Sequence, residues 1–199
     1  MIRNKKDLRY YLEQDALVNG VNKNVFSFIF PNKITNFLKS LRYLEYYSYS
    51  TPSMYSRLLW IVTKIRYRRL SYQLGFSIPI NVFGPGLSIP HYGTIVVNPN
   101  ARIGANCRLH VGVNIGASSG RPEAPQIGNN VYIGPGAILF GNITIADNVT
   151  IGANATVNKS CDVEYAVLAG TPAKIVKTNS LNWVQFNKVE VNKDADKRL

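Results

Sequence analysis

The sequence predicts a mainly β protein, a triangular parallel β-helix preceded by an α-helical domain. First, aliphatic residues recur every six residues between about residues 83 and 176. Second, Asn or Gly occupies most positions where such a repeat needs a tight corner. Third, residues 1–75 have few glycines and show helical spacing of apolar residues. We therefore expect a helical domain at 1–75, a β-helix at 76–176 and a tail at 177–199.

The hexads count from Val97, and all ten first positions are aliphatic: Val97, Ile103, Leu109, Ile115, Ile127, Ile133, Leu139, Ile145, Ile151 and Val157. Eight of the ten fourth positions are Asn or Gly, and the fifth positions are mostly small or β-branched. A short strand and a corner every six residues give three strands per coil. The aliphatic first positions then stack inside a prism and each coil pairs with its neighbours.

The register breaks in two places. Between Ile115 and Ile127, the stretch from Arg121 to Gln126 has no aliphatic first position, which predicts a loop projecting from a corner. Near residues 89–97, two extra residues shift the phase around His91. An insertion can leave a solenoid intact, and such loops often carry function.

Helices are expected at 7–14, 31–49 and 53–74, the last bounded by Pro52 and Gly75. Lys64, Arg66, Arg68 and Arg69 are interpreted as a solvated face of the third helix. In the tail, Trp183 and Phe186 are expected to dock back onto the protein. Cys107 and Cys161 fall at fifth positions and predict packing thiols. The sequons at Asn142, Asn148 and Asn154 have corner spacing and are interpreted as corners.

The chain carries 23 Lys and Arg against 11 Asp and Glu, a net charge of +12. This charge favours anionic partners without choosing among them, and no recognised motif supports nucleic-acid binding. The apolar runs at 25–30 and 58–62 are too short to span a bilayer. With no signal-peptide pattern at the start, we expect a cytoplasmic protein with at most a peripheral membrane contact.

Two histidines stand out as candidate functional residues. His91 and His110 are 19 residues apart, close to the 18 of one coil, so both are expected near one edge on neighbouring coils. A neutral imidazole is a good general base for a hydroxyl group. His91 also lies beside a register break, where a purely structural solenoid has no need for imidazole.

Three motifs resemble the serine acetyltransferase branch of the hexapeptide-repeat acyltransferases: Phe83-Gly-Pro-Gly-Leu-Ser-Ile-Pro-His91, Gly93-Thr-Ile-Val-Val97 and Leu168-Ala-Gly-Thr-Pro-Ala-Lys-Ile-Val176. The resemblance covers roughly residues 70–177. It implies a left-handed, single-stranded β-helix and a homotrimer with its sites between subunits. It also implies acetyl transfer from acetyl-CoA to a hydroxyl group, without a metal.

In this resemblance His91 matches the catalytic base, and backbone N–H groups would stabilise the oxyanion. His110 is a possible second-line group. The positions that match coenzyme-contacting residues of the family are Gly136, Ala137, Ala153, Thr171 and Lys174. The acidic position of the family's helical domain, which faces the acceptor, is matched by Asp15.

Other family positions are changed. The acidic residues expected about fifteen positions before the histidine and directly before it are replaced by Phe76-Ser77 and Pro90. The Arg-His pair that contacts the serine carboxylate is matched by Glu123-Ala124 in the projecting loop, where Glu123 could replace an acidic partner. A saccharide acceptor in polysaccharide biosynthesis is therefore the leading expectation.

Several alternatives remain open. One is serine O-acetyltransferase activity in cysteine biosynthesis, and another is a non-catalytic β-solenoid assembly protein. An enzyme similar to the γ-class carbonic anhydrases would need three histidine ligands for its metal, and this chain has two histidines.

Overall fold

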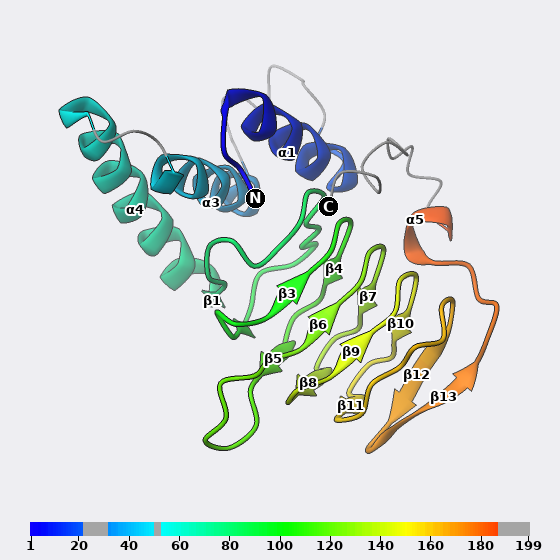
Figure 1. Ribbon diagram of the computed structural model, residues 1–199. Helices are drawn as coiled ribbons and strands as arrows, with labels where there is room; N and C mark the ends of the chain where they lie inside the picture. The colour runs from blue at the N-terminus through cyan, green and yellow to red at the C-terminus, as the bar shows by residue number, and fades with distance from the viewer. Residues whose placement is uncertain (22–31, 50–52, 187–199) are drawn as a thin grey trace.

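The computed structural model describes residues 1–21, 32–49 and 53–186, and it shows helices packed against one end of a β-helix (Figure 1). The helices are α1 (Lys5–Val18), α3 (Lys33–Tyr49), α4 (Met54–Leu74) and the short α5 (Trp183–Phe186). Ser53 caps α4 with a capping box, and Gly75 ends it in the left-handed conformation. The helices predicted at 31–49 and 53–74 are confirmed. The first helix is longer than predicted, and the run at 25–30 lies outside the described residues.

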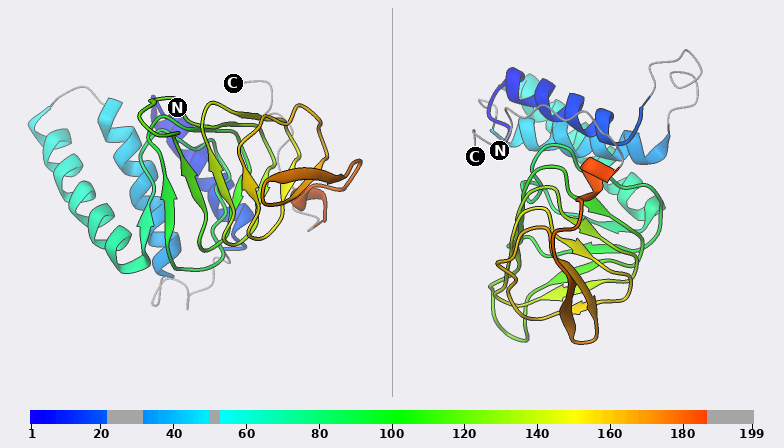
Figure 2. Two further views of the ribbon diagram at one scale, coloured as in Figure 1. Left: turned by 90° about the horizontal axis from the view of Figure 1, so that it is seen from below. Right: turned by 90° about the vertical axis from the view of Figure 1, so that its right-hand side faces the viewer.

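The coils form three faces. Face A contains β1 (Phe76–Ser77), β2 (Ile95–Val97), β5 (Asn114–Gly116), β8 (Ile138–Phe140) and β11 (Thr156–Val157). Face B contains β3 (Arg102–Ile103), β6 (Gln126–Ile127) and β9 (Thr144–Ile145). Face C contains β4 (Arg108–Leu109), β7 (Tyr132–Ile133), β10 (Thr150–Ile151), β12 (Val167–Gly170) and β13 (Ala173–Lys177). The right-hand view of Figure 2 looks along the stack of coils.

Pairing follows the coil repeat. Successive strands of each face pair in parallel, and the antiparallel hairpin of β12 and β13 closes the stack. Every aliphatic first position of the ten hexads is buried. Equivalent residues meet between coils, as in the pairing of Ile115 with Leu139 and of Ile133 with Ile151. The predicted prism with an aliphatic interior is thus confirmed.

Strand β8 offers a matched test of this interior. Leu139 is 0% exposed whereas its neighbour Ile138, on the outer side of the strand, is 40% exposed. We expect Leu139→Ala to lower the free energy of unfolding by about 2–5 kcal/mol, because it leaves a cavity between coils. Ile138→Ala should cost about 1 kcal/mol or less. Urea unfolding of both variants checks this, and equal losses would contradict the assignment of the two side chains.

The corners define three edges of the prism. Six of the ten fourth positions take positive φ, as the corner interpretation requires: Asn106, Gly112, Asn130, Gly136, Asn148 and Asn154. At the B–C edge the asparagines form a ladder. The amide of Asn106 donates to Asn130 at 2.9 Å, and that of Asn130 donates to Asn148 at 3.1 Å. Repeated side-chain pairing therefore stabilises this edge as well as the backbone conformation.

Both register breaks appear as loops at edges. The predicted projecting loop connects β5 to β6 at the A–B edge (Figure 1), and it returns to the core at Ala124. The second break lies at the C–A edge, between Ile89 and Ile95, and contains His91. Neither loop interrupts the parallel pairing of the coils around it.

A buried ion pair attaches the helices to the first coil. Arg42 on α3 donates to Asp15 on α1 and to Glu45, and also to the backbone oxygens of Phe83 and Gly84. Burial alone would lower the pKa of Arg42, but the two carboxylates outweigh it and the pKa is raised. The cluster of Arg42, Asp15 and Glu45 therefore connects the helices to the first coil through buried charges, and we call it the charged joint.

The tail docks only in part as predicted. Trp183 is buried and donates from its indole N–H to the backbone oxygen of Asn106 at 2.8 Å, whereas Phe186 is 75% exposed.

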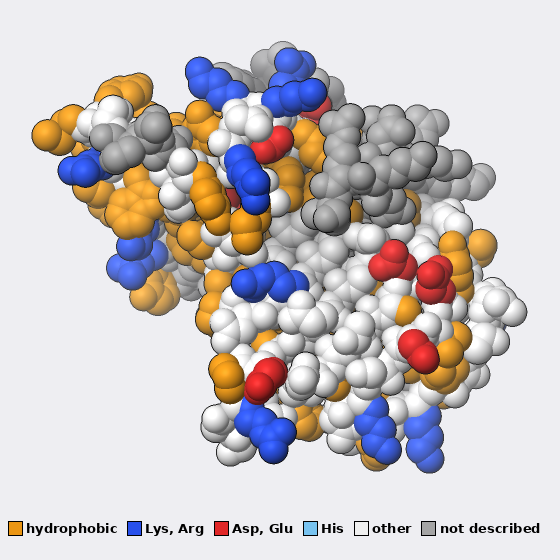
Figure 3. All heavy atoms as spheres, in the orientation of Figure 1, with side chains coloured by type: hydrophobic (Ala, Val, Ile, Leu, Met, Phe, Trp, Pro, Cys, Tyr) orange, Lys and Arg blue, Asp and Glu red, His pale blue; other side chains and the backbone are white. Residues whose placement is uncertain are grey.

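Helix α4 extends away from the coils and exposes large apolar side chains (Figures 2 and 3). Its basic residues Arg66, Arg68 and Arg69 are exposed, as expected.

Candidate active site

The C–A edge brings the two histidines together. His91 follows face C in the first coil and His110 follows β4 in the next, and their ring centroids are 6.1 Å apart. Between them the backbone is tightly packed: a Cβ on Gly93, where φ is 132°, would lie 2.4 Å from Cγ2 of Val111. Only glycine therefore fits at this position, two residues after His91.

His110 is half-buried, and its ring lies 5.0 Å from the ring of Tyr132. Its Nε2 atom is buried and has no hydrogen-bond partner among the described residues. Burial lowers the pKa of His110, and electrostatic interaction with the nearby Arg108 and His91 lowers it further. His110 is therefore held neutral, and its buried Nε2 atom is left without a hydrogen-bond partner among the described residues.

This lowered pKa predicts a pH dependence of stability. Below the ordinary pKa of 6.5, the unfolded chain takes up a proton at His110 more readily than the folded chain does. The free energy of unfolding should therefore decrease as the pH falls below 6.5 and be unaffected by His110 above it. Urea unfolding at several pH values checks this: His110→Gln should reduce the slope below 6.5, and an unchanged slope would contradict it.

A basic residue that sequence analysis missed lies on the same coil. Arg108 projects from β4, donates to the hydroxyl of Ser88 at 3.2 Å and lies 5.4 Å from the ring centroid of Trp183. It has no carboxylate partner among the described residues. Burial lowers the pKa of Arg108. The signal that could have drawn attention to it is its position two residues before His110, at the start of β4.

Arg108 lines a cavity of about 230 Å³ between the helices and face C, whose wall also includes Pro90, the residue before His91. The other lining residues are Val18, Asn19, Asn32, Ile34, Thr35, Ser88 and Ile89. A cavity of this size with one guanidinium suits a small anionic molecule.

The positions matched to coenzyme contacts continue along the C–A edge. The amide of Gly136 donates to the carbonyl of Val111 at 2.9 Å, next to His110. One coil further, Ala153 is exposed, and the hydroxyl of Thr171 donates to the backbone oxygen of Asn154 at 3.2 Å. Ala137 is buried just behind Gly136, and Lys174 is exposed on β13, paired with Ala169. All five thus lie at or beside the edge that carries His91.

The two predicted acidic contacts lie away from the C–A edge in this structure. Asp15 is 3% exposed and accepts hydrogen bonds from Arg42 and from the backbone amides of Gly86 and Leu87, near the B–C edge. Both carboxylate oxygens of Asp15 therefore make hydrogen bonds within the fold. Glu123 is exposed in the loop at the A–B edge. Within one subunit it is separated from His91 by face A.

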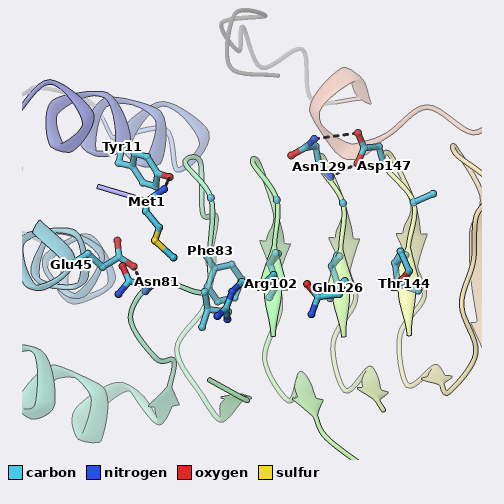
Figure 4. Close-up of a pocket in the computed structure, with 18 residues that line it drawn as sticks. Met1, Tyr11, Glu45, Asn81, Phe83, Arg102, Gln126, Asn129, Thr144 and Asp147 are labelled. Atoms are coloured by element: carbon cyan, nitrogen blue, oxygen red, sulfur yellow. Dashed lines mark hydrogen bonds between the residues drawn. The ribbon is translucent and has the colours of Figure 1, made fainter. Parts of the chain in front are cut away.

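A larger cavity, of about 560 Å³, lies in a different place, along face B (Figure 4). Arg102, Gln126 and Thr144 lie in a row along its floor, and Met1 and Tyr11 lie at the helical end. Its carboxylates are engaged: Glu45 pairs with Arg42, and Asp147 accepts from the amide of Asn129 at 2.6 Å. The groove contains neither histidine, so the C–A edge is the candidate active site.

Comparisons with known proteins identify relatives in sequence and in fold. The family described as bacterial transferase hexapeptide (six repeats) matches residues 124–159. A serine acetyltransferase of Staphylococcus xylosus is 34% identical over 127 residues, 62% of this chain and 58% of that protein. One of Buchnera aphidicola is 26% identical over 179 residues, 85% of this chain and 68% of that protein. The chain thus spans between half and about two thirds of the length of these two curated relatives.

Among solved structures, serine acetyltransferase of Brucella abortus in complex with coenzyme A superposes with a TM-score of 0.66 at 23% identity. The match covers 89% of this chain and 69% of that one. This similarity shows the fold, a left-handed parallel β-helix with helices at its N-terminal end. The resemblance to the serine acetyltransferase branch is confirmed.

Proposed function

We propose that this chain is an acetyl-CoA-dependent O-acetyltransferase with His91 as its general base. The observation that carries the proposal is the C–A edge, which places His91, His110 and the positions matched to coenzyme contacts along one line. The similarity to serine acetyltransferases supports the same activity. A solenoid used only as a scaffold would not require this arrangement.

The proposed reaction is a direct transfer. A ring nitrogen of His91 takes the proton of the acceptor hydroxyl, and the hydroxyl oxygen attacks the carbonyl carbon of the thioester. Backbone N–H groups at the edge would stabilise the oxyanion. The carbon–sulfur bond then breaks, and the leaving thiolate takes the proton from His91.

The exposed groups along the C–A edge suit the binding of coenzyme A. Gly112, Ala153 and Thr171 are exposed along it, so the amide-containing arm of the coenzyme could approach the backbone closely. Lys174 is exposed at the far end, where an ammonium group suits phosphate.

Serine is the acceptor that the comparisons favour, in place of the saccharide expected from the sequence. The relatives named above are serine acetyltransferases. The loop has Glu123-Ala124 where the family has its basic pair, and Arg108 in its cavity offers a different cation for the acceptor carboxylate. A saccharide remains the second candidate, because the changed loop lacks the pair that grips serine.

A panel of acceptors tests this choice. Release of free thiol from acetyl-CoA is measured with L-serine, with ethanolamine, which is serine without its carboxylate, and with a set of sugars. We expect L-serine to give the highest kcat/KM. A sugar that exceeds L-serine would replace serine as the acceptor, and no thiol release with any hydroxyl compound would contradict the proposed activity.

Arg108→Gln tests the carboxylate contact. It should raise KM for L-serine by about tenfold or more, since it removes one charge-assisted hydrogen bond of about 1.5–3 kcal/mol, and leave ethanolamine unaffected. Arg102→Gln is the matched control, because Arg102 occupies the same hexad position on face B. Equal losses with both acceptors would contradict a carboxylate role for Arg108.

We also propose a homotrimer, in which the loop that carries Glu123 could meet the C–A edge of a neighbouring subunit. Light scattering on the full chain should give about three times the monomer mass of 22.2 kDa. A monomeric mass would contradict this arrangement and with it any contact of Glu123 with His91.

A further inference from the structure

Helix α4 has two opposite faces, and one of them is largely exposed. On the inner face, Tyr67 stacks on Phe37 of α3 with ring centroids 5.5 Å apart, and Leu70 packs against the core. The outer face exposes large apolar side chains at a spacing of three to four residues. These residues, the outer stripe of α4, are Met54, Tyr55, Leu58, Ile61, Val62, Ile65 and Tyr72.

Basic residues flank the outer stripe on both sides. By helical spacing, Arg57, Lys64 and Arg68 lie along one margin and Arg66 lies along the other, whereas Arg69 falls within the stripe, between Ile65 and Tyr72. The 21 residues of α4 include no Asp or Glu. Figure 3 shows the apolar side chains at the upper left with Lys and Arg beside them. The whole segment 1–75 has 13 Lys and Arg against four Asp and Glu, so it carries +9 of the net charge of +12.

The combination of an apolar stripe with basic margins limits which partners can bind this face of α4. Nucleic acid would match the charge but would leave the Leu and Ile side chains uncovered. A second α4 helix would cover the apolar stripe but would place ten Lys and Arg side chains around one contact, with no acid in either helix. An anionic lipid surface matches both features, since acyl chains cover the stripe and headgroups face the basic margins.

We propose that the outer stripe of α4 docks the protein onto an anionic membrane surface. The helix lies along the surface, because its inner face is already packed on α3. In the described ranges no helix is long and apolar enough to cross a membrane. The stripe from Met54 to Tyr72 covers about 27 Å of helix axis, enough for a stable lateral contact. This docking is independent of the acetyl transfer proposed above.

Flotation of the full chain with lipid vesicles tests the proposal. Vesicles containing phosphatidylglycerol should carry the protein to the top of the gradient, whereas phosphatidylcholine vesicles should not. Binding should weaken as salt is raised. Absence of binding to the anionic vesicles at low salt would overturn the proposal.

Two α4 variants separate the apolar and charged contributions. Leu58→Ser/Ile61→Ser/Ile65→Ser should lower the partition coefficient by at least about tenfold. Arg66→Gln/Arg69→Gln should lower it about fivefold for each charge removed. The controls at the other end of the chain are Leu181→Ser/Phe186→Ser and Lys159→Gln/Lys177→Gln, all exposed. If the controls lose binding as strongly as the α4 variants, the contact is not made by α4.

The same variants decide between a membrane and a second copy of the chain. Without lipid, all of them should keep the native mass in light scattering and the native melting temperature. A drop in mass confined to the Leu58/Ile61/Ile65 variant would show that the stripe is a contact between subunits, and this would overturn the proposal.

Discussion

His91→Ala should lower kcat/KM for acetyl transfer by about 10²–10⁴-fold, since this is the usual contribution of a positioned general base. The side chain is exposed at the C–A edge and makes no hydrogen bond with any described residue. The substitution therefore removes no packing from the core, and the melting temperature should be unchanged. Rates are measured by thiol release with the best acceptor of the panel.

Lys39→Ala serves as the control, because Lys39 is exposed on α3 and takes no part in the proposed site. It should retain full activity. His110→Ala should cost less than His91→Ala, because His110 is half-buried behind the edge and its Nε2 atom is buried, whereas His91 is exposed. Full activity in His91→Ala, with the fold intact, would remove the mechanism.

The β-helix could be predicted because its information is local. Each hexad carries its own strand and corner, so ten aliphatic first positions establish the prism without knowledge of distant contacts. The same period predicts that His91 and His110 are neighbours, since 19 residues are nearly one coil. The left-handed sense of the β-helix is not encoded in the single hexad, and predicting it required the resemblance to a known family.

The roles of Asp15, Arg42 and Arg108 could not be predicted from local pattern. Each depends on partners far away in sequence: Asp15 and Arg42 are 27 residues apart, and Arg108 lies 20 residues from Ser88. The one available signal was that Arg42 and Glu45 interrupt the apolar stripe of α3 three residues apart. Charged residues on a buried face need partners, but the sequence does not say which.

Arg42→Met should lower the free energy of unfolding by about 3–5 kcal/mol, because it leaves two buried carboxylates without their cation. Asp15 and Glu45 are 3% and 2% exposed, and the carbonyls of Phe83 and Gly84 lose their donors as well. The methionine fills much of the volume, so the loss is mainly electrostatic. Urea unfolding at neutral pH measures it.

The ion pair of Arg9 and Glu13 on α1 provides the control. Its N–O distance of 2.8 Å equals that of Arg42 and Asp15, but its side chains are 82% and 59% exposed. Arg9→Met should therefore cost far less than Arg42→Met, since water already solvates both charges. Comparable losses in the two variants would show that burial does not decide the strength of these contacts.

Glu45→Gln keeps the argument testable if Arg42→Met fails to fold. It leaves an oxygen for the amide of Asn81 but replaces the oxygen that accepts from Arg42 with an NH2 group, so we expect a loss of about 1.5–3 kcal/mol. Rates of backbone amide exchange then show which part of the chain opens first when the charged joint is weakened. In Arg42→Met, or in Asp15→Ala, exchange at Gly86 and Leu87 should accelerate before exchange in β7 and β10, because only the former amides donate to Asp15. Uniform acceleration in all coils would mean that the helices and the prism unfold as one unit, and that this cluster does not act as a separate joint.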